Sequence, residues 1–282
     1  MMLYDAHLHV GQFYERYTSP DDLLRMAERL GLDGFAVSST TMCEENYSKV
    51  LEEFRLLEAY SKVAFAPVLW ITPALLATDG ETERFLDSGI GWRCLKIHPD
   101  LNPGLWNTDD AWFDALKELS AMLDVPVLIH TGGNDYSEAG IWERKIRENP
   151  ETTFILAHCR PVAQAAELME VFPNVYGDLA FVSVGGIAAL LRRGLAHKLL
   201  WGTDFPIVNR FIEGQDMRQY QNVLLQTVRD NTTEADYKSV TSDNFKTIYN
   251  INGNDTKRDS PGEDTGIVYG GPAEILQDAP DP

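Results

Sequence analysis

Short apolar runs alternate with longer amphipathic runs from the start of the chain to about residue 251, and this alternation restricts the fold more than any other feature. The apolar runs are short and the longer amphipathic runs have helical spacing, which predicts strands joined by helices. Strands are expected at eight places: Leu3–Val10, Gly34–Ser38, Val63–Ile71, Trp92–His98, Val125–His130, Thr153–His158, Val175–Leu179 and Leu199–Thr203. Since strands connected through helices pair in parallel, the sheet should be parallel.

Eight strand–helix units predict an α/β fold with a single domain, a parallel eight-stranded (β/α)8 TIM barrel over residues 1–251. The alternative is an open doubly wound sheet, which usually has a glycine-rich phosphate loop after its first strand. No such loop follows Val10. Residues 252–282 are acidic, rich in Gly and Pro, and lack apolar periodicity, so a C-terminal tail is expected there.

Two helix starts are predicted from local signals. Ser19 precedes Pro20 and two aspartates, a pattern typical of a capped N-terminus. Thr41 and Glu44 have the spacing of a capping box, which predicts a second helix from that point to about Ser61.

The composition excludes several kinds of partner. The 43 acids and 24 bases give a net charge of −19, which disfavours binding to a phosphate backbone, so no nucleic-acid partner is expected. The three cysteines form no CxxC pair, which fits a reducing compartment. The sequence shows no apolar stretch long enough to span a membrane and no secretory signal, so a cytoplasmic protein with no membrane partner is expected.

Polar residues at strand ends carry the chemistry. His7 and His9 lie one strand step apart and therefore point to the same face. His130, His158 and Asp204 each end a later apolar strand. The carboxyl ends of parallel barrel strands converge on one face, where such enzymes place their active sites. Three or more imidazoles and a carboxylate there predict a site for zinc or a related divalent ion.

With these residues, three further segments make the chain resemble the amidohydrolase superfamily, and within it the amidohydrolase 2 branch of metal-dependent lactonases and decarboxylases. The segments are Lys96-Ile97-His98-Pro99, Ala157-His158-Cys159 and Gly202-Thr203-Asp204-Phe205-Pro206. Asn244–Tyr249 is similar to the closing helix of that family. The resemblance spans residues 1 to about 251.

The resemblance implies that His7, His9, His130 and Asp204 bind one divalent metal, with zinc expected and manganese, iron or cobalt also compatible. It implies that Asp204 and His158 are catalytic. Asp204 would accept the proton of the attacking water, and His158 would polarise the substrate or hold that water. In relatives with two metals the strand-four lysine is carboxylated. Here the favoured interpretation is one metal and a free Lys96 that contacts substrate.

Two further residues are candidates for substrate binding. His98 lies two positions beyond Lys96, and Arg160 follows His158 with a guanidinium suited to a carboxylate. Structural roles for both stay open, as does a pocket-lining role for Asp178.

The expected function is metal-dependent hydrolysis of an amide, ester or lactone carbonyl in a small molecule. The alternative on the same site is non-oxidative decarboxylation, and a third reading is a binding protein that kept its metal. A homodimer is compatible with the resemblance.

Overall fold

The computed structural model describes residues 2–101, 106, 110–132, 134–210 and 216–251. The predicted tail, residues 252–282, lies outside the described residues.

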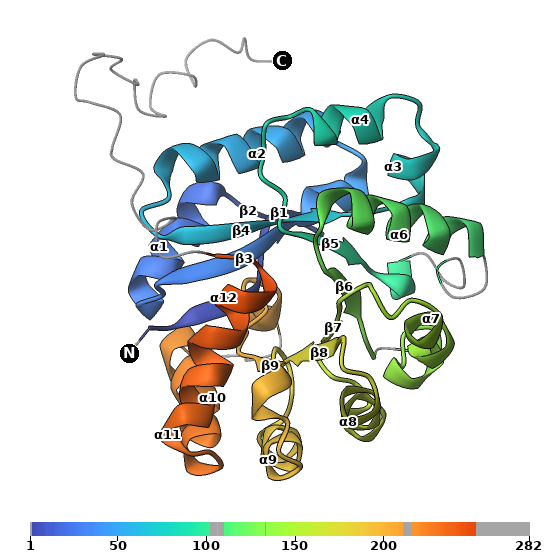
Figure 1. Cartoon of the computed structure of the whole chain (residues 1–282). Coiled ribbons are helices and arrows are strands. Elements are labelled where there is room, and N and C mark those ends of the chain that lie inside the picture. Colours follow the sequence, from blue (N-terminus) through green and yellow to red (C-terminus); the bar gives the residue numbers. More distant parts are fainter. Residues whose placement is uncertain (1, 102–105, 107–109, 133, 211–215, 252–282) are drawn as a thin grey trace.

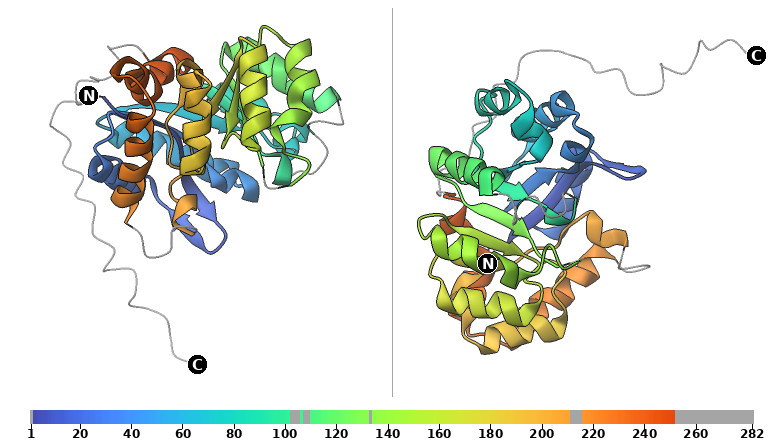
Figure 2. Two further views of the ribbon diagram at one scale, coloured as in Figure 1. Left: turned by 90° about the horizontal axis from the view of Figure 1, so that it is seen from below. Right: turned by 90° about the vertical axis from the view of Figure 1, so that its right-hand side faces the viewer.

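The fold is built on one curled sheet in which eight strands pair in parallel, each with the next of the eight. These parallel strands are β1 (Tyr4–Phe13), β3 (Gly34–Ser39), β4 (Ala64–Trp70), β5 (Cys94–Ile97), β6 (Val127–His130), β7 (Phe154–Ala157), β8 (Val175–Asp178) and β9 (Leu199–Leu200). Helices surround the strands on the outside (Figures 1 and 2).

Backbone hydrogen bonds join the last strand to the first. The Ala6 N–H donates to the Trp201 carbonyl at 2.9 Å, the Asp204 N–H to the His7 carbonyl at 2.8 Å, and the His9 N–H to the Phe205 carbonyl at 2.8 Å. The sheet is therefore closed, which confirms the (β/α)8 TIM barrel and excludes the open sheet.

The helices follow the strands as the alternation predicts. They are α1 (Pro20–Leu30), α2 (Tyr47–Tyr60), α3 (Pro73–Ala77), α4 (Glu81–Leu86), α6 (Asp110–Leu123), α7 (Glu143–Glu148), α8 (Val162–Val171), α9 (Val184–Arg192), α10 (Met217–Asp230), α11 (Glu234–Lys238) and α12 (Asn244–Ile248). No helix among the described residues is both long enough and apolar enough to cross a lipid bilayer.

One predicted helix start is confirmed and one is wrong. Ser19 and Asp22 form a reciprocal capping box at the start of α1. The Thr41–Glu44 capping box does not form, because α2 begins six residues later at Tyr47 and is capped by Asn46. Residues Thr40–Glu44 form a separate 3₁₀ helix instead.

β1 continues beyond its predicted end and turns back as an antiparallel hairpin with β2 (Arg16–Thr18). Sequence analysis missed this hairpin, because it adds a strand outside the barrel. Gly11, on the hairpin, has φ +95°, and a Cβ there would lie 2.4 Å from Thr41 Oγ1. Only glycine allows this close approach of the hairpin to the loop after β3.

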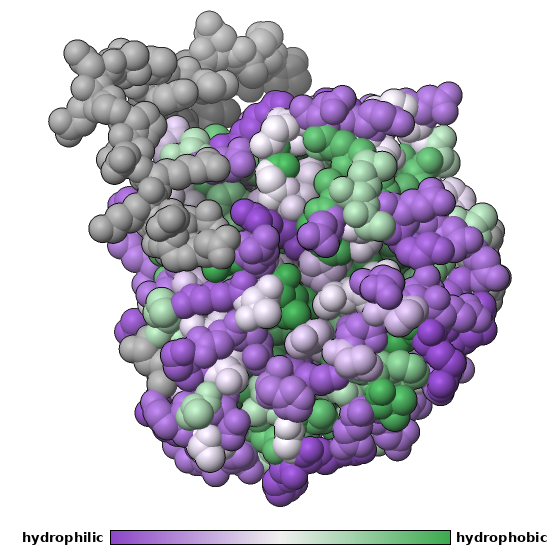
Figure 3. All heavy atoms as spheres, viewed as in Figure 1, coloured by the Kyte–Doolittle hydropathy of each residue, from purple (hydrophilic) through white to green (hydrophobic). Residues whose placement is uncertain are grey.

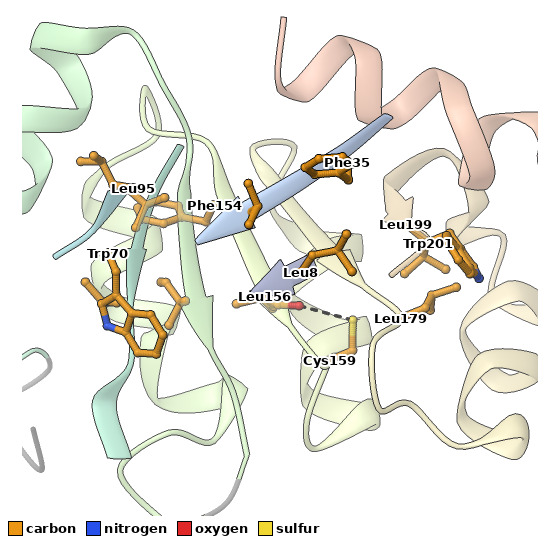
Figure 4. Close-up of a cluster of buried hydrophobic side chains, with 14 of the residues drawn as sticks. Leu8, Phe35, Trp70, Leu95, Phe154, Leu156, Cys159, Leu179, Leu199 and Trp201 are labelled. Atoms are coloured by element: carbon orange, nitrogen blue, oxygen red, sulfur yellow. Dashed lines mark hydrogen bonds between the residues drawn. The ribbon is translucent and has the colours of Figure 1, made fainter. Parts of the chain in front are cut away.

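Buried side chains form two layers, one inside the barrel and one between its strands and the outer helices. Small and medium side chains such as Ala6, Ala66 and Leu128 fill the interior, together with Phe245 and Tyr249 from the C-terminal helix. Larger apolar side chains pack between the strands and the outer helices (Figure 4), among them Leu8, Phe35, Leu95, Phe154 and Leu156. Polar residues cover most of the face seen in Figure 3, with hydrophobic ones in small groups.

A shift of pairing register between Asp5 and Leu8 interrupts the alternation of β1. Tyr4 and Ala6 belong to the interior layer, whereas Leu8 belongs to the outer layer. A bulge of this kind re-aims side chains. It lets His7 face the barrel interior next to Ala6.

A buried carboxylate ties the hairpin to α2. Glu53 accepts hydrogen bonds from Ser39 Oγ at 2.5 Å and Thr41 Oγ1 at 2.9 Å, and it also bonds the Tyr17 hydroxyl. The Gln12 N–H donates to Thr41 Oγ1 at 3.0 Å. One carboxylate thus holds β2, the loop after β3 and α2 together.

Replacing Glu53 with alanine should lower the free energy of unfolding by about 2–4 kcal/mol, because buried hydroxyl donors lose their acceptor. Urea denaturation measures the change. Glu52→Ala is the matched control, since Glu52 is exposed and pairs only with Lys49 at the surface. Its effect should stay within about 0.5 kcal/mol. Equal losses in the two variants would contradict the structural role of Glu53.

Candidate active site

His7 and His9 are buried at the carboxyl end of β1, and each has one ring nitrogen already engaged. His7 Nδ1 donates to Asp178 Oδ2 at 2.9 Å, and His9 Nδ1 lies 2.9 Å from Ser38 Oγ. A carboxylate can only accept, so Asp178 keeps the proton of His7 on Nδ1 and leaves a lone pair on His7 Nε2. The Ser38 hydroxyl can donate or accept, so it orients the His9 ring without fixing its tautomer.

Asp204 faces the two imidazoles from the segment after β9. Its Oδ1 lies 2.9 Å from His9 Nε2 and 3.7 Å from His7 Nε2. This oxygen is buried, yet it accepts no hydrogen bond from any residue that the structure describes. Two imidazole nitrogens and a carboxylate oxygen that converge on one point can form a cradle for a cation. The donor set of two imidazoles and a carboxylate therefore fits a divalent metal ion.

Lys96 reaches the same point from β5. It is fully buried, and its Nζ lies 2.9 Å from His7 Nε2, 3.3 Å from His9 Nε2 and 4.7 Å from the centre of the Trp70 ring. Burial lowers the pKa of Lys96 to about 8. Lys96 thus lies against the candidate metal ligands His7 and His9. Its contact with substrate stays a prediction.

His158 and His130 form the opposite side of the site. His158 Nδ1 donates to the Ala180 carbonyl at 3.0 Å, so His158 Nε2 carries a lone pair, which faces His130 Nδ1 at 3.1 Å. Ligand atoms of His158, His7 and Asp204 lie within 4.8 Å of one another. His130 contacts His158 and stacks on His98 with ring centres 3.7 Å apart. Its place in the metal's ligand set stays a prediction.

Two of these residues have strained backbones. His158 has φ 68° and Asp204 has φ 58°, in the left-handed region that side chains other than glycine and asparagine seldom adopt. Such outliers gather at functional sites, where the surrounding structure holds them. The neighbouring Cys159 points away from the site. Its Sγ packs in the outer apolar layer near the Leu156 carbonyl (Figure 4), so its role there is packing.

Apart from Asp178, the site candidates singled out in the sequence line one cavity of about 280 Å³. They are His7, His9, Lys96, His98, His130, His158, Arg160 and Asp204. Its apolar lining comes from Phe13, Trp70, Phe181 and Ile207. The structure therefore brings these distant polar residues together, as the sequence predicts.

Arg160 and His98 both line this cavity and have unpaired polar atoms. Arg160 Nε and His98 Nδ1 are both buried and have no hydrogen-bond partner among the described residues. The Arg160 guanidinium lies 5.9 Å from the centre of the Phe181 ring, and the His98 ring stacks on Trp70 with centres 5.6 Å apart. Both can offer a hydrogen bond to a molecule in the cavity.

Sequence reasoning missed three residues that support the site. Asp178 was weighed only as pocket lining, but it orients His7 and also accepts the His158 N–H at 2.9 Å through Oδ1. Ser38 orients His9. Asp5 joins the first and last strands by accepting from the His7 N–H at 3.0 Å and the Thr203 hydroxyl at 2.7 Å. Their positions at the ends of β8 and β3 and the start of β1 were the available signal.

The cavity histidines should make metal-stripped protein sensitive to acid. Burial lowers the pKa of His9, His98 and His158 well below the usual value, so they stay neutral in the folded state. Below a pH of about 6.5 the unfolded chain protonates them and binds more protons than the folded state does. The free energy of unfolding contributed by these groups therefore falls as the pH falls.

His98→Asn isolates one of these groups. Between pH 7 and 5.5 the variant should lose about 1.3 kcal/mol less of its free energy of unfolding than the wild type, since one histidine no longer titrates. Urea denaturation at the two pH values measures this difference. Asp5 acts in the opposite direction in both proteins, because burial raises its pKa to about 7, and so it cancels from the comparison. Identical pH profiles for variant and wild type would refute the neutral state of His98.

Comparison with known proteins adds three solved structures of the same fold. One is a probable 2-pyrone-4,6-dicarboxylic acid hydrolase from Acinetobacter baumannii with citric acid bound, at 13% identity and a TM-score of 0.64, covering 89% of this chain and 100% of that chain. Another is 4-oxalomesaconate hydratase from Rhodopseudomonas palustris, at 16% identity and a TM-score of 0.61, covering 88% of this chain and 96% of that chain. The third is 5-carboxyvanillate decarboxylase from Sphingomonas paucimobilis, at 13% identity and a TM-score of 0.61, covering 89% of this chain and 99% of that chain. Identities this low show the fold alone. A sequence search among curated proteins found no match.

A sequence model described as amidohydrolase matches residues 4–251. The match begins at the first residue of β1, ends with the last described residue of the barrel, and contains every residue of the cavity. This chain therefore belongs to the amidohydrolase family, whose members are hydrolytic enzymes.

Proposed function

We propose that this protein is a metal-dependent hydrolase that adds water to an amide, ester or lactone carbonyl of a small carboxylate-bearing molecule. The observation that carries the proposal is the cradle formed by His7 Nε2, His9 Nε2 and the buried, unpaired Asp204 Oδ1. These residues would hold one divalent ion, with zinc favoured for a nitrogen and oxygen donor set and manganese, iron or cobalt compatible. His130 joins them as a proposed ligand.

A divalent ion held by these residues would supply Lewis acidity, which lowers the pKa of a water molecule towards about 7 and polarises a carbonyl. Asp204 supplies the base. Burial raises the pKa of its carboxyl group, which makes the carboxylate a stronger proton acceptor. His158 lies beside the cradle, since its ligand atom is within 4.8 Å of those of His7 and Asp204, and it can hold the attacking water or, once protonated, stabilise the developing oxyanion.

Arg160 and Lys96 are proposed to bind the substrate. The unpaired Nε of Arg160 suits one oxygen of a carboxylate, and the guanidinium fork can supply a second contact. Lys96 Nζ faces the Nε2 atoms of His7 and His9. A nitrogen lone pair that accepts a proton from Lys96 cannot bind a cation at the same time. With the cation bound, the Lys96 ammonium is left to pair with a substrate oxygen. Phe13, Trp70 and Ile207 give the cavity an apolar wall against which the rest of the substrate can pack.

The test uses protein purified without chelator. Elemental analysis should find about one equivalent of a divalent metal. Mass spectrometry should then find one ¹⁸O atom in the product when a panel of carboxylate-bearing lactones, cyclic amides and esters is incubated in ¹⁸O-labelled water. Removal of the metal with a chelator should abolish turnover, and its return should restore it.

Three other outcomes would overturn the proposal. Release of carbon dioxide without incorporation of water would assign a decarboxylase instead. Two equivalents of metal would indicate a carboxylated Lys96. A metal-free protein that binds panel members without converting them would indicate a binding protein.

A further inference from the structure

A second, larger cavity lies beside the active-site cavity. It has a volume of about 670 Å³ and lies between the β1–β2 hairpin, α1 and the segment after β9. Four arginines line it: Arg16, Arg25, Arg29 and Arg210. Four guanidinium groups around one hollow are notable in a chain whose net charge is −19. We call this hollow the arginine cavity.

Two of the four arginines already have carboxylate partners. Arg25 pairs with Asp21 and Asp22, and Arg29 pairs with Asp216. Arg16 and Arg210 form no ion pair with any residue in the described part of the chain. These two guanidiniums therefore supply the net positive charge of the cavity.

The arginine cavity and the active-site cavity share a wall. Phe13 lines both. The segment after β9 divides its side chains between them: Asp204 and Ile207 face the active-site cavity, whereas Phe205 and Pro206 face the arginine cavity. The two hollows therefore adjoin each other along Phe13 and the segment after β9.

The two unpaired arginines flank the shared wall. Arg16 lies directly opposite Phe13 in the register of the hairpin. The Arg210 guanidinium lies 5.4 Å from the centre of the Phe13 ring and 4.7 Å from that of Tyr14. The hairpin is itself held by the hydrogen bond of Tyr17 to buried Glu53. The Arg210 guanidinium therefore lies at the junction of the cavities, and the hairpin register holds Arg16 across from Phe13.

We propose that the arginine cavity binds a second anionic group, a phosphate or a carboxylate, at the far end of the substrate whose carbonyl lies against Asp204. Paired guanidiniums are the side chains best suited to such oxyanions. Because Phe13 borders both hollows, a substrate that extends past it from the active-site cavity would reach Arg16 and Arg210. This assignment to the substrate rests on the proposed hydrolase function, whereas the anion site itself does not.

Binding of methylphosphonate tests the site, with saturation-transfer NMR on its methyl protons as the readout. Arg16→Ala and Arg210→Ala should each weaken binding about tenfold, the loss expected for one charge-assisted contact. Arg55→Ala is the matched control, since Arg55 is an exposed arginine of α2 away from the cavity, and binding should be unchanged.

Two results would overturn the anion site. One is the absence of binding to the wild type. The other is binding that is lost in Arg160→Ala but kept in Arg16→Ala, which would place the probe in the active-site cavity.

Kinetics separate the substrate from an independent anion. For panel members that carry a second anionic group, Arg16→Ala should raise KM about tenfold and leave kcat unchanged, whereas KM for members without that group should not change. Methylphosphonate should compete with the former. Binding of methylphosphonate without any effect of Arg16→Ala on KM would assign the cavity to a separate ligand. Failure of every panel member to react would refute the hydrolase, while the binding measurements would still decide the chemistry of the cavity.

Discussion

Asp204→Asn is expected to lower kcat/KM by about 10²–10⁴-fold, the range of rate enhancement supplied by a positioned general base. Asparagine keeps the shape of the side chain but cannot accept a proton at neutral pH. It also replaces a charged ligand by a neutral one, so metal content should fall with activity. The backbone of Asp204 has φ 58°, a conformation that asparagine tolerates, so the variant should fold.

Steady-state kinetics and elemental analysis of the same preparation measure both losses. Asp135→Asn is the matched control, because Asp135 is an exposed aspartate in the loop after β6. It should retain full activity and metal. An Asp204→Asn protein with wild-type kcat/KM would remove Asp204 from the mechanism, whatever its metal content.

Asp178→Asn is expected to lower metal affinity about 10–100-fold, the effect usual for a residue that orients a metal-binding histidine. Asp178 Oδ1 accepts the N–H groups of His158 at 2.9 Å and Ala180 at 3.1 Å, and Oδ2 accepts the proton of His7 Nδ1. An asparagine that keeps the backbone contacts through its oxygen presents an NH₂ group to His7. His7 Nδ1 would then have to accept, which moves its proton to Nε2 and blocks the ligand atom.

Competition with a chelating indicator dye measures this affinity, and thermal denaturation of the metal-free variant shows whether the fold is kept. Ser38→Ala serves as a graded comparison. It removes the partner of His9 Nδ1 without forcing a tautomer, so its loss of affinity should be smaller. Equal affinity in Asp178→Asn and wild type would show that His7 does not depend on Asp178 for its tautomer.

Much of the fold could be predicted because its signals are local. Continuous β-branched runs such as Val127–His130 are buried on both faces, which makes them recognisable as parallel strands. Ser19 and Asp22 cap α1 through contacts three residues apart. The same kind of rule failed at Thr41, because its hydroxyl donates to Glu53 rather than capping a helix. A local sequence pattern carries no information about a hydrogen-bond partner on another element.

The candidate site was predictable as a set of residues. His7, His9, His130, His158 and Asp204 stand at the ends of apolar strands, and a parallel barrel gathers those ends on one face. Which atom of each residue faces the centre was not predictable. That choice depends on Asp178, which lies 171 positions from His7, and on Ser38, which lies 29 positions from His9.

The sequence by itself determined the order of strands and helices and the side chains that end each strand, because strand and helix periodicity is written in neighbouring residues. The tertiary structure alone decided the bulge in β1, the nitrogen that each imidazole offers, and the meeting of Arg16 with Arg210 beside Phe13. The physical reason is that hydrogen bonds and ring contacts act over a few ångströms, and only closure of the barrel brings such distant positions that near.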